Sequence, residues 1–316
     1  MAAAEAALEA TSEDAGTSTS AGSPSWQQLA EERNANGMLS LAGFTVEGIS
    51  VAGQETCIIL PQLKLVFDTG RCPQRSVYQQ TVLLSHGHLD HVGGLPFHVA
   101  TRSMLSLPPS IVLLPAAIEE GTRSFLDGLS ALNGGALEYE LKPCQAGKEV
   151  QLGNKHFAVP FPTSHPVASQ GYVVYSRRQK LKAHLVGKPS NEIRDLKLSG
   201  QEVSDTVDVP EVAFTGDTSA DFLTSPASKA AFRAKLLIME LTFLESGGTV
   251  STEHAREMGH MHIDDFIAHA DKFQNECILL IHFSARYSRA VILDLLAAKL
   301  PDNLRSKCVP LLEGFR

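Results

Sequence analysis

One short run of the sequence limits the fold and chemistry of this chain more than any other feature. The segment HGHLDH, residues 86–91, places three histidines and an aspartate in six positions directly behind the apolar run TVLL. In an extended segment side chains alternate between two faces, so His86 and His88 point the same way, and a turn just after them can bring Asp90 and His91 toward the same cavity. Imidazole and carboxylate are the ligands that zinc accepts where no thiolate is offered. The run therefore predicts a metal site at the end of a buried strand.

Three more candidate ligands, which lie much later in the sequence, extend this prediction from one metal to a pair of metals. Each follows an apolar run, at the kind of strand end where α/β folds place their chemistry: His165 follows FAVPFPTS, Asp217 follows VAFTG and His282 follows CILLI. Any one of them alone is more simply explained as a core or loop residue. Pairs of metals about 3.5 to 4 Å apart are a common solution for cleaving phosphodiesters, and such a pair needs ligands beyond HGHLDH.

The rest of the chain has the pattern of a globular α/β protein. Short apolar and β-branched runs, beginning at Phe44, Glu55 and Leu63, predict strands, and helical spacing alternates with strands from about Gly93 onward. Among 316 residues, 43% are hydrophobic and 20% charged, which is ordinary globular usage. Length alone leaves open one large domain or two small ones.

Composition also excludes several classes of protein. The apolar runs are shorter than the roughly 18 to 20 residues that cross a bilayer, so we expect no membrane partner. Five scattered cysteines without a C-x-x-C pair argue against a disulfide framework or a cysteine-based zinc site. The net charge of −8 argues against a general polyanion binder, although it can hide a local basic stripe.

The N-terminal residues differ in composition from the remainder. We expect residues 1–38 to form a disordered acidic tail and residues 39–316 to form the folded domain. The first 25 residues lack the basic start and apolar core of a signal peptide, and four acidic residues argue against a transit peptide. A cytoplasmic location is therefore expected, with the nucleus as a second candidate compartment.

A basic segment interrupts the α/β pattern at residues 176–207. It combines seven cations with few large apolar residues, so it reads as an insertion within the domain. These cations form a local basic stripe of the kind that the net charge of the whole chain can hide. A solvated surface loop is the simpler alternative. The cations are Arg177, Arg178, Lys180, Lys182, Lys188, Arg194 and Lys197.

Several motifs together resemble those of a known family. SHGHLDHVGGLP resembles the signature of the metallo-β-lactamase fold, and FDTGRCP, PTSHP, FTGDT, MELTF, GHMH and HFSARY follow in the order seen in ribonuclease Z. From about residue 42 onward the chain resembles the short plant-type form. The resemblance implies an αββα sandwich of the α/β class with an inserted basic arm. In the family such an arm holds the tRNA, and phosphate contacts from Arg and Lys give this affinity without reading sequence. It also implies a homodimeric zinc-dependent endonuclease that removes the 3′ trailer from precursor tRNA.

The resemblance assigns the metal ligands position by position. It implies two zinc ions per subunit, although this ligand set also accepts other divalent metals such as manganese or iron. It makes Asp90 the residue that takes the nucleophile's proton, and Asp68 a residue that braces the histidine loop. The implied ligands are His86, His88 and His165 for one ion, Asp90, His91 and His282 for the other, and Asp217 for both.

A carboxylate–imidazole pair is implied as the general acid. Glu240 in MELTF matches a glutamate that pairs with the histidine matched here by His260, and a carboxylate beside an imidazole favours its protonated form near neutral pH. His262, two positions on, is the rival for this role. Arg286 in HFSARY could bind a substrate phosphate or form a structural ion pair.

Two alternative functions are compatible with this fold, and the sequence differs from the family's usual motifs at two places. A small-molecule hydrolase of the same fold would need the same ligands but no basic arm, and a binding protein with a decayed site would have lost ligands. The arm lacks the Gly-Pro-rich run of many family members, for which only GKPSNE is a faint counterpart. MELTF and GHMH are variants of the commoner spellings, although both keep the residues needed for chemistry.

Overall fold

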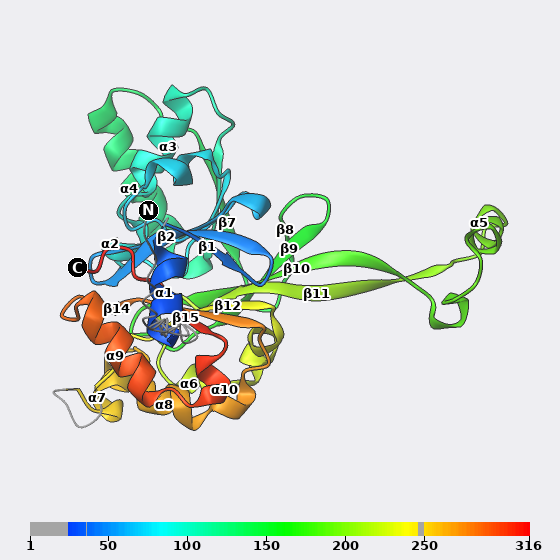
Figure 1. Cartoon of the computed structure of the whole chain (residues 1–316). Coiled ribbons are helices and arrows are strands. Elements are labelled where there is room, and N and C mark those ends of the chain that lie inside the picture. Colours follow the sequence, from blue (N-terminus) through cyan, green and yellow to red (C-terminus); the bar gives the residue numbers. More distant parts are fainter. Residues whose placement is uncertain (1–24, 36, 246–249) are drawn as a thin grey trace, which may run out of the picture.

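The chain folds into two β-sheets packed face to face with helices on both outer faces, and a long two-stranded arm projects to one side (Figure 1). The computed structural model describes residues 25–35, 37–245 and 250–316. The expected αββα sandwich with an inserted arm is confirmed. Within the described residues, no helix has the length and apolar character that a membrane crossing requires.

The first sheet has the strand order β1-β2-β3-β4-β5-β6-β7, and β14 pairs in parallel with β2. The runs beginning at Phe44 and Glu55 form β2 and β3 as predicted. The strands are β1 (Met38–Leu41), β2 (Phe44–Ala52), β3 (Glu55–Leu60), β4 (Leu65–Phe67), β5 (Thr81–Leu83), β6 (Ser110–Pro115), β7 (Tyr139–Cys144) and β14 (Phe283–Ser284).

The second sheet has the order β15-β13-β12-β11-β10-β9-β8. Its strands are β8 (Val150–Gln151), β9 (His156–Pro162), β10 (Gln170–Leu181), β11 (Ser204–Phe214), β12 (Leu236–Glu240), β13 (Cys277–Ile281) and β15 (Cys308–Pro310). The α-helices are α1 (Trp26–Asn34), α2 (Leu89–Val92), α3 (Leu95–Met104), α4 (Glu119–Asn133), α5 (Ser190–Leu198), α6 (Asp221–Thr224), α7 (Thr252–Glu257), α8 (Ile263–Ala268), α9 (Arg289–Lys299) and α10 (Asp302–Arg305).

The alternation of side chains along each strand divides the core into three apolar layers. In β4, Phe67 enters the layer between the sheets, whereas Val66 faces α3 and α4 on the outside of the first sheet. Phe67 stacks on Phe214 of the second sheet with ring centroids 4.7 Å apart. The outer face of the second sheet packs against α6, α8 and α9. Burial on both faces explains why these strands read as continuous apolar runs.

Parallel pairing brings the chemistry-bearing residues to one edge of the sandwich. Strands β4, β5, β6 and β7 are parallel to one another, as are β11, β12, β13 and β15. Asp68 and His86 follow β4 and β5, while Asp217 and His282 follow β11 and β13. The carboxyl ends of parallel strands meet at a common edge, so residues far apart in sequence converge there.

The prediction of a disordered tail up to residue 38 is wrong for its last part, because folded structure begins before that residue. Residues 25–35 form a capped helix, in which the Ser25 side chain accepts from the Gln28 amide and the Gln28 side chain accepts from the Ser25 amide. Ala30 is buried, and Trp26 packs against the core beside the second sheet. This helix was missed because its apolar side chains are few, so tertiary packing rather than hydrophobic periodicity stabilises it. The remainder of the expected tail, residues 1–24, lies outside the described residues.

The two ends of the basic segment extend the second sheet, and the residues between them form turns and a helix. Strands β10 and β11 pair in antiparallel register from Tyr172 and Phe214 out to Leu181 and Ser204, and α5 lies at the far end. In Figure 1 this arm projects well beyond the body of the molecule. The arm therefore places residues 177–207 away from the edge at which the histidines gather.

Candidate active site

The HGHLDH loop is fixed by the strand before it and by close backbone packing. β5 ends at Leu83, and His86 is fully buried two residues after Leu84. The short helix α2 begins directly after His88, which turns Asp90 and His91 back toward His86. Gly70 of the FDTG motif lies against this loop so closely that a Cβ there would overlap the carbonyl of Asp90. Glycine is required at position 70 for this contact.

Three histidines form the first candidate ligand group. The Nδ1 atom of His88 lies 3.0 Å from Nε2 of His86 and 3.2 Å from Nε2 of His165. His86 is buried, whereas His88 is exposed to solvent. The candidate ligand atoms of these three side chains all lie within 4.8 Å of one another, a spacing that one cation can span.

The second candidate ligand group consists of Asp90, His91 and His282. The Nε2 atoms of His91 and His282 each lie 3.6 Å from Oδ2 of Asp90 and 3.4 Å from each other. His282 reaches this position with a left-handed backbone, φ 59°, directly after β13. The Gly53 amide donates to Asp90 Oδ2 over 2.9 Å and fixes the direction of this carboxylate.

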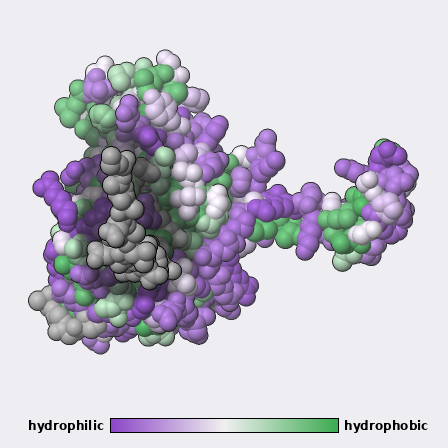
Figure 2. Space-filling view, in the orientation of Figure 1, coloured by the Kyte–Doolittle hydropathy of each residue, from purple (hydrophilic) through white to green (hydrophobic). Residues whose placement is uncertain are grey.

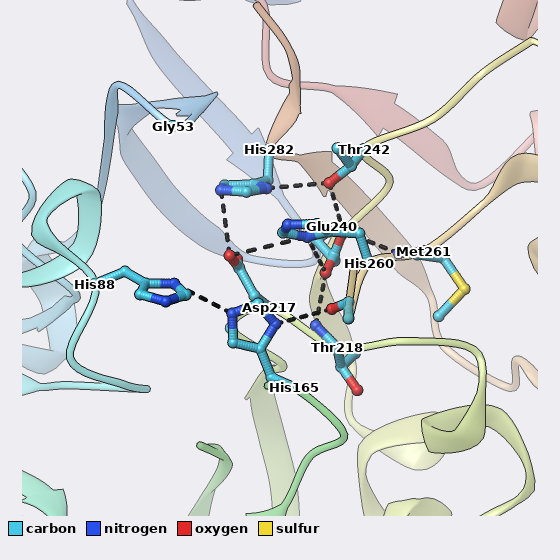
Figure 3. A network of polar contacts seen from close by, with 12 residues as sticks. Gly53, His88, His165, Asp217, Thr218, Glu240, Thr242, His260, Met261 and His282 are labelled. Atoms are coloured by element: carbon cyan, nitrogen blue, oxygen red, sulfur yellow. Dashed lines mark hydrogen bonds and ion pairs between the residues drawn. The ribbon is translucent and has the colours of Figure 1, made fainter. Parts of the chain in front are cut away.

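Asp217 lies between the two groups. Its Oδ2 atom is 3.8 Å from His86 Nε2, 3.3 Å from His91 Nε2 and 3.4 Å from His282 Nε2. The carboxylate is almost fully buried. Figure 3 shows Asp217 between His88 and His165 on one side and His282 on the other, in a position from which one carboxylate can contact two cations.

The electrostatics of this cluster favour bound cations. Burial, followed by the charge of His91, lowers the pKa of His86 to about 2. Burial also disfavours a charged His91, but Asp217 and Asp68 outweigh it and hold the pKa of His91 well above its usual value. In the absence of a cation this imidazole binds a proton between two carboxylates. A metal supplies the same positive charge, so the donor set fits a pair of divalent cations.

A second layer of hydrogen bonds directs one nitrogen of each buried histidine toward the cluster. Asp68 Oδ2 accepts from His91 Nδ1 and from the Ser85 hydroxyl, both over 2.7 Å. Because the Ser85 hydrogen is used in this way, its oxygen accepts from His86 Nδ1 at 2.9 Å. Such outer partners fix the tautomer and leave Nε2 free to bind a metal.

The same arrangement holds the two histidines from later in the chain. His165 Nδ1 donates to the Gly259 carbonyl over 2.9 Å. The Thr242 hydroxyl donates to Glu240 Oε2 over 2.5 Å, so it accepts from His282 Nδ1 at 3.1 Å. Sequence reasoning missed Ser85 and Thr242, although each stands within two residues of a motif residue already singled out.

Glu240 links this second layer to His260. Its fully buried carboxylate accepts from the Thr218 amide over 2.6 Å, from the Met261 amide over 3.1 Å and from His260 Nδ1 over 3.2 Å (Figure 3). Burial alone would lower the pKa of His260, but the Glu240 carboxylate outweighs it and raises that pKa to about 9. His260 Nδ1 is also 3.9 Å from Asp217 Oδ2. A protonated imidazole therefore stands beside the cluster.

His262 occupies a different environment. Its Nε2 donates to the Glu245 carbonyl over 2.9 Å, and its Nδ1 accepts from the Asp264 amide over 3.2 Å at the start of α8. Both nitrogens are thus used to hold the α8 terminus, and the side chain is buried. Of the two rival histidines, His260 is the one in contact with Glu240.

The arm cations named in the sequence analysis lie away from the cluster, and five of the seven form ion pairs with acidic side chains. Arg177 bonds Asp208 over 2.8 Å and lies 4.5 Å from the ring centroid of Phe157. Lys182 lies 3.7 Å from Glu202. Arg178 bonds Glu211, and Lys180 is exposed. Figure 2 shows hydrophilic side chains along the ribbon and an apolar area near its end.

Arg286 has partners within the chain. Its guanidinium lies 3.7 Å from Glu245 Oε2, donates to the Tyr287 hydroxyl over 3.0 Å and stands over the Phe243 ring at 5.6 Å. The side chain keeps substantial exposure at 36%. The ion pair considered from the sequence is therefore present, and a phosphate contact would have to compete with Glu245.

Known proteins with high similarity are tRNase Z enzymes of plants. The sequence is 44% identical over 277 residues to tRNase Z TRZ1 of Arabidopsis thaliana, which covers 88% of this chain and 98% of that relative. It is 43% identical over 281 residues to chloroplastic tRNase Z TRZ2 of the same plant, covering 88% and 78%. Nuclear ribonuclease Z of Triticum aestivum is 46% identical over 169 residues, 54% of this chain and 96% of that relative. No family model matches the sequence.

Solved structures show the same architecture. The metallo-β-lactamase fold protein YhfI of Bacillus subtilis superposes with a TM-score of 0.55 at 15% identity, covering 83% of this chain and 93% of that one. The short form of human tRNase Z superposes with a TM-score of 0.52 at 19% identity, covering 76% and 92%. These likenesses show the metallo-β-lactamase fold, and the 44% identity over 88% of the chain shows that the protein belongs to the tRNase Z, or ribonuclease Z, family.

Proposed function

We propose that this protein is a metal-dependent endoribonuclease that removes the 3′ trailer from precursor tRNA. Water attacks the phosphorus after the discriminator nucleotide and the bond to the ribose 3′-oxygen breaks. The tRNA keeps a 3′-hydroxyl, and the trailer leaves with a 5′-phosphate. The observation that carries the proposal is the contact of Asp217 with both ligand groups and its 3.9 Å distance from His260, which unites metal ligands and acid in one site.

The ligand assignment follows the two groups. We assign one zinc ion to His86, His88 and His165, a second to Asp90, His91 and His282, and the bridging position to Asp217. Bound zinc ions supply the positive charge that activates the attacking water and offsets charge on the phosphate oxygens. Manganese or iron would suit the same ligands. Elemental analysis of active protein tests the count, and fewer than about 1.5 metals per chain would contradict a paired site.

Asp90 and Glu240 have different roles in the proton transfers of the reaction. Asp90, oriented by the Gly53 amide, takes the proton that the attacking water loses. Burial opposes ionisation of Asp90, but its hydrogen bond to His282 and the charge of His91 hold its pKa below the usual range. Glu240 keeps His260 protonated and oriented, so His260 donates a proton to the departing 3′-oxygen.

The arm gives the chain a means of holding a large RNA. Residues 176–207 contain seven Arg and Lys and four Asp and Glu residues, a net positive balance in a chain whose overall charge is −8. We assign phosphate contacts to Arg177, Arg178, Lys180 and Lys182, and to Arg286 near the cluster. A small-molecule hydrolase has no use for such an extension.

We further propose that the enzyme acts as a homodimer. Ser204 starts β11 on the arm, whereas Asp217 follows the other end of the same strand. The 11 residues of β11 span about 36 Å at about 3.3 Å per residue. The arm tip and the cluster of one chain thus lie at opposite ends, so the arm of one subunit would hold the tRNA that the partner cleaves.

Mapping the cut on a labelled precursor tRNA tests the function. Cleavage directly after the discriminator nucleotide, with a 3′-hydroxyl on the tRNA, is expected. Hydrolysis of bis(p-nitrophenyl) phosphate without any cleavage of precursor tRNA would favour the small-molecule hydrolase instead. The same assay with His260→Ala protein controls for contaminating nucleases.

Mixed dimers test action across subunits. Chains that lack the arm tip and chains that carry His260→Ala are each expected to be nearly inactive on precursor tRNA. A heterodimer joins one intact arm to one intact site and is expected to recover activity. Failure to recover in heterodimers verified by mass would exclude action in trans.

We propose a cytoplasmic and nuclear location. The wheat relative is named a nuclear enzyme and one Arabidopsis relative a chloroplastic one, so location varies among relatives. A fluorescent fusion at the C-terminus tests this assignment, and signal confined to an organelle would contradict it.

A further inference from the structure

The direction in which the arm projects is set at its root, the part of β10 and β11 nearest to the body of the domain. Among the described residues, β9 pairs with β10 only as far as Ser176, and β12 pairs with β11 only at Val212–Phe214. Beyond these points the arm is a two-stranded ribbon with no neighbouring strand. An isolated two-stranded ribbon is marginally stable and free to twist or bend. The contacts at its base must therefore decide where it points.

A bulge lies at this base. Pairing passes from Val174 with Val212 directly to Tyr175 with Pro210, so Glu211 is the extra residue of β11. Bulges bend the strand that carries them and redirect a side chain. Here the carboxylate of Glu211 is 4% exposed, although it lies on a projecting ribbon with acidic and basic residues open to solvent.

Three side chains converge on the buried carboxylate. The Ser176 hydroxyl and the Arg178 guanidinium, both on β10, donate to Oε1. Lys235 Nζ, from the segment that enters β12 in the core, lies 2.8 Å from Oε2. The Lys235 amide also donates to the Pro210 carbonyl over 3.3 Å. The Glu211 carboxylate thus links β10 of the arm to the segment that precedes β12 in the body of the domain.

We propose that Glu211 is a positioning residue that fixes the direction of the arm relative to the core, with Arg178 and Lys235 as its two charged partners. These three side chains are called the clamp below. Arg178, assigned above to a substrate phosphate, then serves the base of the arm instead, and the phosphate contacts that remain assigned to the arm are Arg177, Lys180 and Lys182. A buried charge that loses one partner is strongly penalised, so the clamp has few alternative arrangements. The consequence for tRNA binding rests on the function proposed above.

The opposite face of the root offers a matched control. Arg177 pairs there with Asp208 and with Glu149, and the three side chains are 39%, 37% and 48% exposed. Exposed ion pairs of this kind contribute little to rigidity. Asp208→Asn and Glu211→Gln therefore remove the same charge from the same strand in a solvated and a buried setting.

Spin-label distance measurements test the clamp without RNA. Labels on Ser199→Cys at the arm end and Glu276→Cys on the body, with the half-buried Cys72 replaced by Ser, report the spread of arm positions. Labelled chains are diluted with unlabelled chains so that only distances within one chain are seen. We expect a narrow distribution in the otherwise unchanged protein and in Asp208→Asn, and a broad one in Glu211→Gln.

Lys235→Met keeps the test decisive if Glu211→Gln fails to fold. Lys235 is 31% exposed, and Glu211 keeps Ser176 and Arg178 as partners in this variant. We therefore expect the fold to survive while the link to the core is cut. It is expected to broaden the distribution as well. Distributions as narrow as that of Asp208→Asn in every folded Glu211 and Lys235 variant would overturn the proposal.

Steady-state kinetics of the same variants then distinguish the proposed role of Glu211 from the proposed role of the arm in tRNA binding. If the freed arm occupies its binding position about one tenth of the time, KM for precursor tRNA rises about tenfold. The kcat value and the hydrolysis of bis(p-nitrophenyl) phosphate are expected to stay unchanged, because the cluster is untouched. A broadened distribution with unchanged KM would support the clamp and count against the arm as the tRNA-holding element.

Discussion

The metal cluster and the arm are both built from charged and polar side chains, but the fold holds them differently. At the cluster, His86, His91 and His282 are almost fully buried, and each has its second nitrogen bound by a partner within the core. On the arm, Arg177 pairs with Asp208 across the exposed ribbon, and Lys188 pairs with Glu192 of α5 at the arm end. The first region is organised before any ligand arrives, whereas the second exchanges its partners with solvent easily. Substitutions should therefore act in an all-or-none manner at the cluster and in graded steps on the arm.

The largest effect is expected for Asp217→Ala. This change removes a carboxylate that lies near both candidate ligand groups, at 3.8 Å from His86 and 3.4 Å from His282. Cleavage of precursor tRNA and of bis(p-nitrophenyl) phosphate should both disappear, and bound metal should fall from about two to about one or fewer per chain. Asp208→Ala on the arm is the control. An Asp217→Ala protein with full metal content and activity would contradict the bridging assignment.

His260→Ala is expected to have the next largest effect. Loss of a general acid typically lowers turnover by about 10² to 10⁴, and metal content should stay the same. His262→Ala is the matched comparison, because that side chain holds the start of α8 and should lower Tm with little change in kcat. If His262→Ala is the crippled variant and His260→Ala is not, the acid has been assigned two residues too early.

Thr242→Val tests the hydrogen bonds behind His282. The methyl group leaves His282 Nδ1 without its acceptor and Glu240 without one donor, and removal of such outer partners typically weakens metal binding about 10- to 100-fold. Competition with a chelator measures this affinity, and Thr242→Ser should keep it. Equal metal affinity in the Val and Ser variants would show that the hydroxyl does not orient His282.

The smallest of these effects concerns pH. The Glu240 carboxylate raises the pKa of His260, so the protonated acid is retained at higher pH and kcat falls as pH rises through that pKa. In Glu240→Gln the raising charge is absent, so this fall should begin about one unit lower or more. The kcat–pH profile on precursor tRNA measures it. An unmoved alkaline limb would separate Glu240 from His260.

Local patterns predicted the cluster well because strand ends can be read from the sequence. HGHLDH, Asp217 and His282 each follow an apolar run, so a gathering of these residues at strand ends could be proposed from the sequence. The αββα sandwich was expected from the resemblance of the motifs to a known family. The same logic identified the arm as an interruption. What it could not give was the arm's form, because paired strands rich in Lys and Arg lack the apolar alternation that marks a half-buried strand.

Contacts between distant segments account for what was missed. The carboxylate of Glu211 meets Lys235 only because a bulge turns it inward, and no spacing in the sequence encodes that meeting. Helix α1 has few apolar residues and forms by docking through Trp26 and Ala30. Thr242 was closer to prediction, since it follows Glu240 by two positions at the same strand end.

Shortening the arm tests the division between chemistry and RNA holding most directly. Replacing residues 182–203 with an Asn-Gly turn joins Leu181 to Ser204, which already pair in register, and removes four cations. We predict unchanged hydrolysis of bis(p-nitrophenyl) phosphate and weaker binding of precursor tRNA. Of the phosphate contacts assigned above, this variant loses Lys182, so the slope of log affinity against log salt should become shallower by about 0.9. Loss of further contacts from Lys188, Arg194 and Lys197 would bring the change to about three to four. Unchanged tRNA affinity and salt slope in a correctly folded variant would contradict the account.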